Sequence, residues 1–537
     1  MPDVRFHACA AAVALLAACG QSAGPAAAPY PIDDSPGAAT AWLSEDRVVV
    51  GDFSHVVAVA AGQERIWIVS PDAVLGWDHR FEQWDGPYPL DRGGSLERVQ
   101  WALVDPLDQS LWLGHPNGWL HWQPDLKVWD GGTAPATVRG IFFDGADPGA
   151  GLYLRTAGGW LEVPRGSGVA TPSPGPARPA GPASVQQGLS ENPSFAVTSS
   201  SMLDARMRPV RITSAVESWD RRGWYFGTWG SGVLYVERGL PSPVPLRYGL
   251  AGELVGALYA APGGVWVATD RAFDDEAALT FVGRELDRFE FVTGPAATGL
   301  PFTASRAIVG HGDALWLATD AGAVRIDVAD DRASVVDESR GLPDSRVLAL
   351  ANRGRSIEAG TRHGLARILA DSLRAETLAP DEVGAITAVA VLRDTPWVGT
   401  AAGVRVLSAD GSRLLMPAGL ATASFSRPIL QLAWAGDTLM ALVRDGLFWR
   451  DAAGVWTLGP DPTGLLGELG YMAVDREGVW LVGDAAIGFA RPGAAALPVI
   501  RPDQIPGRVT GIAVDESYLW VGTTSGVVRF RIAALRP

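Results

Sequence analysis

The segment at residues 313–326 reads DALWLATDAGAVRI, and close copies of it recur along the chain. The copies are DTPWVGTAAGVRVL at 394–407, SYLWVGTTSGVVRF at 517–530 and the variant RGWYFGTWGSGVLYV at 222–236. In each copy large apolar residues alternate with small ones, a turn with Thr and Gly follows, and a second alternating run continues. A period of two on both sides of a tight turn is typical of a β-hairpin. The repeat therefore predicts an all-β protein.

The spacing of the repeats predicts the architecture. Marking the large residue of each first strand identifies eleven units, at Trp67, Trp112, Tyr153, Tyr225, Trp266, Trp316, Glu358, Trp397, Leu439, Trp480 and Trp520. Eight of the ten gaps between marks are 39 to 45 residues long. That is the length of four short strands with their turns, one blade of a β-propeller. We therefore predict a propeller array of about eleven four-stranded blade units.

Single rings usually hold four to eight blades, so eleven units favour two rings. We expect seven blades in residues 241–537. The other four marks lie in residues 42–240 and, together with the strand-like Arg47–Val50, predict a smaller partner ring. One oversized ring, closed by Val48–Val50 on the last strand near Phe530, is the alternative. The 72-residue gap holds a Pro-rich insert, 164–190, which we expect to be a flexible loop.

A second repeated element precedes several marks, as in Gly341-Leu342-Pro343 followed by the apolar strand Val347–Leu350. Together the two elements resemble the two-component regulator propeller repeat, which is found in ligand-sensing ectodomains of bacterial sensor proteins. The copy at 341–368 is the closest match, although Glu358 stands where that family usually has Trp. The resemblance implies a propeller that binds a ligand.

The N-terminus predicts a lipoprotein. Residues 1–18 have the form of a secretory signal, and Leu16-Ala17-Ala18-Cys19-Gly20 resembles a bacterial lipobox with Cys19 as the lipidated residue. A Pro/Ala/Gly-rich tether, 19–41, follows. We therefore expect the protein in the cell envelope, held by lipid, with the outer membrane favoured because Gly20 follows the cysteine.

Composition excludes several classes of function. The net charge of −15 argues against nucleic acid as a partner. Cys9 leaves with the signal and Cys19 carries lipid, so neither a disulfide nor a cysteine metal site is expected. The six mature histidines are scattered over separate units, which gives no local metal site. We expect no cofactor.

The turn residues supply the candidate site. Tryptophans at the marks should fill the wedges between blades, whereas Trp229 lies inside a turn. In propellers the turn between the second and third strands, and the loop that enters the innermost strand, share one face. The candidate ligand-binding residues in these turns are Trp229, Asp270, Asp320, Arg362, His363, Arg444 and Asp484. The expected partner is a small ligand, a carbohydrate among the options, or an envelope protein.

The leading hypothesis is thus a lipid-anchored, non-enzymatic propeller that acts as a sensor-like or scaffold module. One alternative is a polysaccharide lyase or hydrolase that uses the acidic cluster Asp270, Asp274, Asp275 and Glu276. Another is an outer-membrane assembly factor, which would share the anchor and the architecture.

Overall fold

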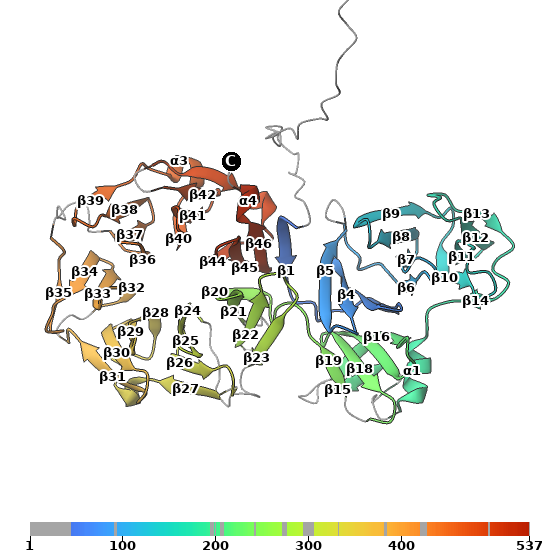
Figure 1. Cartoon of the computed structure of the whole chain (residues 1–537), viewed down its shortest axis with the longest axis horizontal. Helices are drawn as coiled ribbons and strands as arrows, with labels where there is room; N and C mark the ends of the chain where they lie inside the picture. Colours follow the sequence, from blue (N-terminus) through green and yellow to red (C-terminus); the bar gives the residue numbers. More distant parts are fainter. Residues whose placement is uncertain are drawn as a thin grey trace, which may run out of the picture. The chain divides into compact units, whose positions relative to one another are not determined.

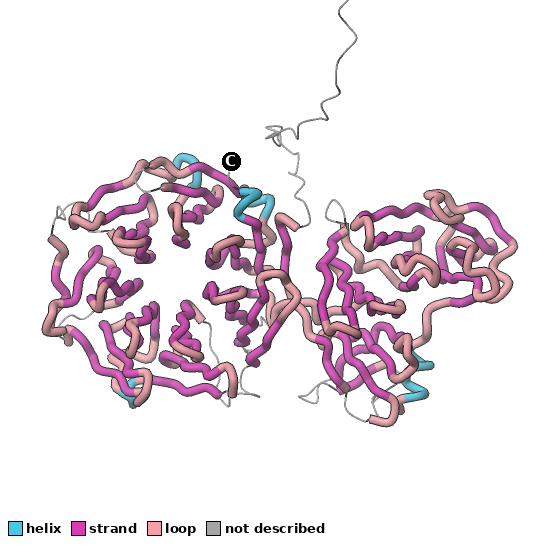
Figure 2. The backbone as a smooth tube through the Cα atoms, in the orientation of Figure 1, coloured by secondary structure: helices cyan, strands magenta, loops and turns pink. Residues whose placement is uncertain are grey.

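The computed structural model describes most of the chain after the tether. The described residues are 45–90, 94–193, 198, 200–203, 209–240, 243–270, 277–293, 305–330, 332–380, 384–418, 427–491 and 494–535. They form eleven antiparallel sheets, so the predicted all-β propeller fold is confirmed. The helices α1 (Val185–Glu191), α3 (Thr463–Leu466) and α4 (Ile532–Leu535) are short, and the strands dominate Figure 2.

Seven of the sheets form a closed ring. Strands within each blade are lettered A to D from the centre outward. The first three blades are β20 (Leu254–Ala261), β21 (Gly264–Asp270), β22 (Ala277–Gly283) and β23 (Phe289–Thr293); β24 (Ala307–His311), β25 (Ala314–Thr319), β26 (Gly322–Asp327) and β27 (Arg332–Val336); and β28 (Val347–Asn352), β29 (Ser356–Thr361), β30 (Gly364–Leu369) and β31 (Arg374–Leu378). The next three are β32 (Ile386–Leu392), β33 (Thr395–Thr400), β34 (Gly403–Leu407) and β35 (Leu414–Leu415); β36 (Gln431–Ala435), β37 (Thr438–Val443), β38 (Gly446–Arg450) and β39 (Trp456–Leu458); and β40 (Leu469–Val474), β41 (Val479–Gly483), β42 (Ile487–Ala490) and β43 (Leu497–Ile500). The seventh holds β44 (Val509–Val514), β45 (Tyr518–Thr523), β46 (Gly526–Arg531) and, as its D strand, β1 (Arg47–Val50).

The ring closes through the first strand of the chain. Each A strand contacts the next, from β20 around to β44 and back to β20 (Figure 1). Strand β1 runs antiparallel to β46, with Arg47 opposite Phe530 and Val50 opposite Val527. The expectation that Arg47–Val50 belongs with the N-terminal blades is therefore wrong. The alternative pairing of Val48–Val50 with the last strand near Phe530 is confirmed, but this pairing closes a seven-bladed ring and not one oversized ring.

The other four sheets form a separate set of blades, which we call the arc. Its first two blades are β2 (Ala58–Ala61), β3 (Arg65–Val69), β4 (Ala73–Asp78) and β5 (Gln83–Pro89), and β6 (Trp101–Val104), β7 (Leu111–His115), β8 (Gly118–Gln123) and β9 (Val128–Thr133). The third holds β10 (Val138–Asp144), β11 (Leu152–Thr156), β12 (Gly159–Val163) and β13 (Thr171–Ser173), with β14 (Pro179–Ala180) on the inner edge of β10. The fourth holds β16 (Pro209–Glu217), β17 (Gly223–Trp229), β18 (Val233–Glu237) and β19 (Val244–Leu246), with β15 (Ser201–Leu203) on the inner edge of β16. Contacts between A strands run from β16 to β2, then to β6 and to β10.

The Pro-rich insert has more structure than expected. Residues 164–190 supply β13, β14 and most of α1, which packs against β16 and β17. Asp144 holds this segment, because its carboxylate accepts the backbone N–H groups of Ala146, Ala177 and Arg178 at 2.7–3.0 Å. The prediction of a flexible loop is wrong for these residues, since a buried carboxylate provides the hydrogen bonds that the composition does not reveal.

The hydrophobic core lies between neighbouring blades, in the wedges. Every one of the eleven marks falls on a B strand, and all of them are buried. The assignment of the mark tryptophans to the core is confirmed; Trp316, Trp480 and Trp520 are fully buried. A large side chain on the B strand fits here because the space between two blades widens away from the ring axis.

The repeated Thr and Gly build the turn between the B and C strands. The hydroxyl of Thr319 donates to the carbonyl of Gly322 at 2.8 Å and accepts the backbone N–H of Ala321 at 3.1 Å. Gly322 has a φ of 129°, in the left-handed region that disfavours residues with a Cβ. The same bond joins Thr361 to Gly364 and Thr523 to Gly526. The sequence motif is thus a turn motif.

Candidate functional site

Each blade is an up-and-down sheet, so its turns fall at two ends. The BC turns and the loops that enter the A strands lie at one end, which we call the BC face. The AB and CD turns lie at the other end, the AB face. The sequence places the candidate site on the BC face, and Asp320, Arg362, His363, Arg444 and Asp484 do lie in BC turns of the seven-bladed ring.

Ion pairs connect the BC turns to the loops that enter the A strands. Asp320 contacts the guanidinium groups of Arg306 at 2.8 Å and Arg346 at 3.2 Å. The hydrogen bond from Arg306 is the main cause that lowers the pKa of Asp320. His363 Nδ1 contacts the carboxylate of Asp344. These side chains therefore have partners in neighbouring loops, which is the arrangement of a surface held together by charge.

The other BC-turn residues behave in a similar way. Arg444 pairs with Glu468 at 3.0 Å, and the backbone N–H of Asp484 donates to the carbonyl of Glu468 at 3.2 Å. The backbone N–H of Arg362 donates to the carbonyl of Arg346 at 3.1 Å. Asp270 ends β21, and its side chain lies outside the described residues, as do Asp274, Asp275 and Glu276.

Trp229 belongs to the arc, so the structure does not bring it together with the BC turns of the ring. Its indole meets the imidazole of His55 edge-on, with ring centroids 4.9 Å apart, and the Arg211 guanidinium lies 5.3 Å from the ring centroid. A backbone bridge also joins His55 to Trp229. This tryptophan is half-buried by contacts within its own blade set.

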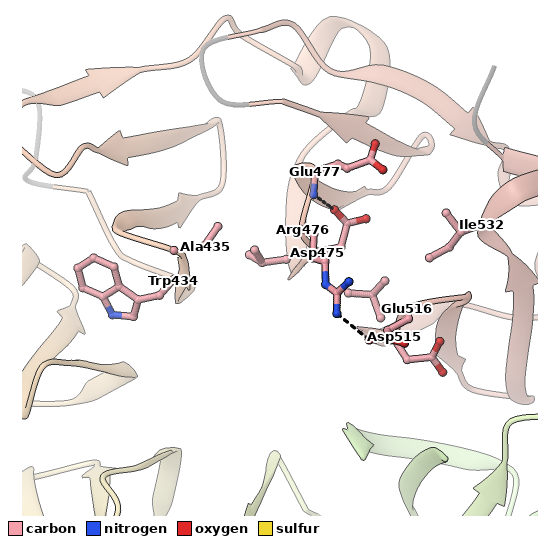
Figure 3. Close-up of a pocket in the computed structure, with 11 residues that line it drawn as sticks. Trp434, Ala435, Asp475, Arg476, Glu477, Asp515, Glu516 and Ile532 are labelled. Atoms are coloured by element: carbon pink, nitrogen blue, oxygen red, sulfur yellow. Dashed lines mark hydrogen bonds and ion pairs between the residues drawn. The ribbon is translucent and has the colours of Figure 1, made fainter. Parts of the chain in front are cut away.

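The ring carries a pocket on its AB face, opposite to the predicted site. The pocket has a volume of about 540 Å³ and is bordered by the AB turns of three successive blades, those of β36–β37, β40–β41 and β44–β45, with Ile532 of α4 at one side (Figure 3). Trp434, Ala435, Val474, Val514 and Ile532 give it an apolar lining. Its size is that of a small-molecule site, commonly 300–1,000 Å³.

The rim of this pocket is acidic. Asp475, Glu477, Asp515 and Glu516 carry four carboxylates against one guanidinium, that of Arg476. Arg476 and Glu516 form an ion pair at 2.7 Å across two blades, seen as a dashed line in Figure 3. Both side chains are largely exposed, so water screens the pair and a ligand can displace it at small cost.

Two of the rim carboxylates hold their turns. Asp475 accepts the backbone N–H groups of Glu477 at 2.7 Å and Gly478 at 2.9 Å, and the indole Nε1–H of Trp480 at 3.2 Å. Asp515 accepts the corresponding bonds from its own turn and from Trp520 at 3.1 Å. An Asp five residues before the mark is the sequence signal for this turn, and the prediction from the repeat does not include it.

Trp434 borders the pocket, but in Figure 3 its indole projects away from Asp475 and Arg476. It packs against the core cluster of Trp397, and within the described part of the chain its buried Nε1 has no hydrogen-bond partner. Its ring meets that of Trp397 edge-on, with centroids 6.0 Å apart. A second pocket, of about 260 Å³, is lined by Trp397 and Arg450 among other residues. The Arg450 guanidinium lies 4.9 Å from the Trp397 ring centroid.

The arc holds a Ser–His–Asp cluster. His121 Nδ1 lies 3.1 Å from both carboxylate oxygens of Asp130, and His121 Nε2 lies 2.9 Å from Ser110 Oγ. Ser110 Oγ, however, donates its hydrogen to Asp108 at 2.6 Å, and the residue is buried. A serine nucleophile must pass its proton to the histidine and reach a substrate. The cluster has the contacts of a triad without an available hydroxyl.

Metal and membrane elements are not seen in the described residues. Among them, no group of three or more His, Cys, Asp or Glu side chains is placed to hold a metal ion. No helix in the same part of the chain is long and apolar enough to cross a membrane.

Comparison with known proteins finds structural neighbours of low sequence identity. No family model and no curated protein matches it. Solved extracellular domains of hybrid two-component systems from Bacteroides thetaiotaomicron are structural neighbours; one has 11% identity and a TM-score of 0.43, over 88% of this chain and 70% of that chain. PorZ, a surface component of the type-IX secretion system of Porphyromonas gingivalis, has 12% identity and a TM-score of 0.44, over 89% and 74%. Virginiamycin B lyase of Staphylococcus aureus has 13% identity and a TM-score of 0.42, over 52% and 94%.

The first of these neighbours are the class of protein that the repeat resemblance named. Identities of 11–13% and TM-scores below 0.5 do not transfer a function to this chain.

Proposed function

We propose that this chain is a lipid-anchored propeller of the bacterial cell envelope that binds a small ligand, without converting it, in the AB-face pocket of its seven-bladed ring. The anchor is Cys19, which lies outside the described residues. The observation that carries the proposal is the pocket itself, an open depression of about 540 Å³ with a mixed apolar and polar lining and an acidic rim.

The lining defines the class of ligand. An indole at the border of the pocket favours a flat apolar or cationic group, because the aromatic quadrupole attracts positive charge. The carboxylates of Glu477 and Glu516 favour a ligand with amine or hydroxyl donors, whereas those of Asp475 and Asp515 hold their own turns. An amine with a planar apolar part meets both conditions, and a sugar meets the second.

The test is a thermal-shift screen of the protein beginning at Trp42, a compact unit by itself. Probes are aromatic amines, polyamines, neutral oligosaccharides and Ca²⁺. Binding to the native state stabilises it by about 2.7 kcal/mol at a ligand concentration a hundredfold above Kd. We expect a shift with aromatic amines that Trp434→Ala and Glu477→Gln reduce.

The two faces are compared in the same experiment. His363→Ala and Arg444→Ala alter the BC face, where the sequence predicts ligand contacts, and leave the AB pocket intact. If these variants abolish the shift while Trp434→Ala preserves it, the ligand binds on the BC face and the pocket assignment is wrong.

Hydrolysis is the second candidate, because the arc contains Ser110, His121 and Asp130 in hydrogen-bonded order. The buried Ser110 and its bond to Asp108 favour a structural role for the cluster. A fluorophosphonate probe labels activated serines covalently. Labelling that disappears in Ser110→Ala would establish a serine hydrolase and displace the binding proposal.

A further inference from the structure

The CD turns of the arc share an unusual feature. Each of the four blades exposes one large apolar side chain there, Phe81, Leu126, Val169 or Leu240, and each of these is 55–68% exposed. Two AB turns of the arc add Leu107 and Trp219, at 59% and 55%. AB and CD turns lie at the same end of a blade, so all six belong to the AB face of the arc. We call them the apolar tips.

The seven-bladed ring does not repeat this pattern. Its first CD turn folds Leu286 inward, to 3% exposure. Its exposed large apolar residues lie mostly elsewhere, as with Leu415, Leu458 and Leu497 on the outermost D strands, although Val455, 57% exposed, lies in a CD turn. The tips are therefore concentrated in the arc, where every blade has one.

Basic residues accompany the tips. Arg80 precedes Phe81 and lies 5.7 Å from its ring centroid, and Lys127, the one lysine of the chain, follows Leu126. Arg221 and Arg222 follow Trp219, and Arg238 precedes Leu240 by two positions. Nearby acids outnumber these bases; within three residues of a tip they are Asp78, Glu82, Asp105, Asp108, Asp125, Glu217, Asp220 and Glu237. Single apolar side chains beside long cationic ones are typical of residues that lie at a membrane–water interface.

The placement of the tips distinguishes a bilayer from a protein partner. A protein interface has its apolar residues at the centre and a polar rim. Here four of the six tips lie on CD turns, at the outer edge of the arc, with polar side chains between them. Separate apolar points at the periphery cannot make one dry contact with a protein surface, but each can enter a continuous apolar layer.

We propose that the AB face of the arc rests on a phospholipid bilayer, with the apolar tips inserted at the level of the headgroups. The inference uses the lipid anchor of the proposed function for membrane proximity. Because acids outnumber bases beside the tips, an anionic surface would repel them, and zwitterionic lipid is the kind of bilayer that fits.

The test uses protein that begins at Trp42, which lacks Cys19, so the anchor cannot contribute. Flotation with vesicles of phosphatidylcholine measures partitioning at low and high salt. We expect weak binding that survives high salt, and a loss of roughly tenfold or more on changing Phe81 and Leu126 to Ser together, because each buried side chain of this size contributes about a tenfold factor. The matched control changes Leu415 and Leu458, equally apolar and on D strands of the ring, to Ser.

The outcomes are distinct. Equal losses from the tip and control variants, or no flotation of the parent protein, would overturn the proposal, and the tips would then be candidates for a protein contact. Binding seen only with phosphatidylglycerol vesicles and abolished by salt would also overturn it, since that is attraction through charge. Failure of lipidation at Cys19, seen by mass spectrometry of the full chain, would remove the anchor and leave this test unchanged.

Discussion

At the scale of the residue, Glu358 is the most informative exception in the repeat. It is fully buried at a position where seven other blades of the eleven have Trp, and its Oε1 contacts Arg367 at 2.8 Å and Arg353 at 3.2 Å. Arg353 lies five residues before the mark, the place that Asp515 has before Trp520. Arg367 lies opposite Glu358 as Arg529 lies opposite Trp520. The donor and the acceptor of the Asp–Trp hydrogen bond thus exchange places in this blade, where Arg353 donates to Glu358.

This reversal predicts a compensating pair. Glu358→Ala leaves two arginines around a buried gap and should cost about 3–5 kcal/mol of unfolding free energy. Arg353→Asp combined with Glu358→Trp recreates the arrangement of the last blade, so the double variant should be more stable than the sum of its single variants by about 1–3 kcal/mol. Urea unfolding of the four proteins measures this coupling. Additive single effects would show that the two sites act independently.

Asp144 gives a pH prediction. The backbone N–H of Ala146 is the main cause that lowers its pKa, with further bonds from Ala177 and Arg178. A lowered folded-state pKa means that the stabilisation is complete above the ordinary carboxyl value of 3.8 and is lost as pH falls through the folded value. Asp144→Asn should therefore speed amide exchange in residues 171–180 at neutral pH, and its difference from the parent should shrink below pH 3.8. Asp147→Asn, whose side chain does not contact residues 171–180, is the control. Equal amide exchange of these residues in the two variants would show that Asp144 does not hold the segment.

At the scale of the element, β1 is the strand on which ring closure depends. Val50 is fully buried and packs with Val255 and Trp520, while Arg531 holds the entrance of the strand through a 2.7 Å bond to Asp46. Val50→Asp places an unpaired charge in this cluster and should destabilise the protein by about 3 kcal/mol or more. Amide exchange should rise first in β46, which loses its edge partner. Val244→Asp, on an exposed D strand of the arc, is the control and should change neither the unfolding free energy nor the amide exchange of β46. If Val50→Asp instead accelerates exchange equally in all strands of the ring, β46 does not open locally and the prediction is wrong.

Sequence patterns predicted the elements within a blade but not the contacts between blades. B and C strands were predictable because their alternation and their Thr–Gly turn are local. The AB pocket was not, since Trp434, Val474 and Val514 lie about 40 residues apart and meet only after the ring has closed. Strand β1 was assigned to the wrong blades because its partner lies more than 470 residues away, and pattern alone does not choose between edges. The roles of Asp144 and of the Asp before the mark depend on hydrogen bonds that composition does not show.

At the scale of the whole molecule, the order of the elements makes the seven-bladed ring dependent on a strand that precedes the arc in the sequence. The chain supplies β1, builds four blades, and only then builds the seven that β1 must close. Strand β1 thus comes first among the described strands, and closure of the ring depends on its pairing with β46. A ring whose last blade lacks its D strand has an exposed edge at β46, which is prone to pairing with other chains.

This order predicts that the ring becomes self-sufficient when its closing strand is moved. A chain of residues 243–535 followed by a short Gly/Ser linker and residues 45–51 contains every strand of the ring. It should be monomeric, unfold cooperatively and give the same thermal shift with aromatic amines as the parent, because all pocket residues lie within it. The same chain without residues 45–51 should melt at a lower temperature and associate through the open edge. Equal melting temperatures and equal monomeric states for the two chains would show that the other six blade contacts hold the ring without β1.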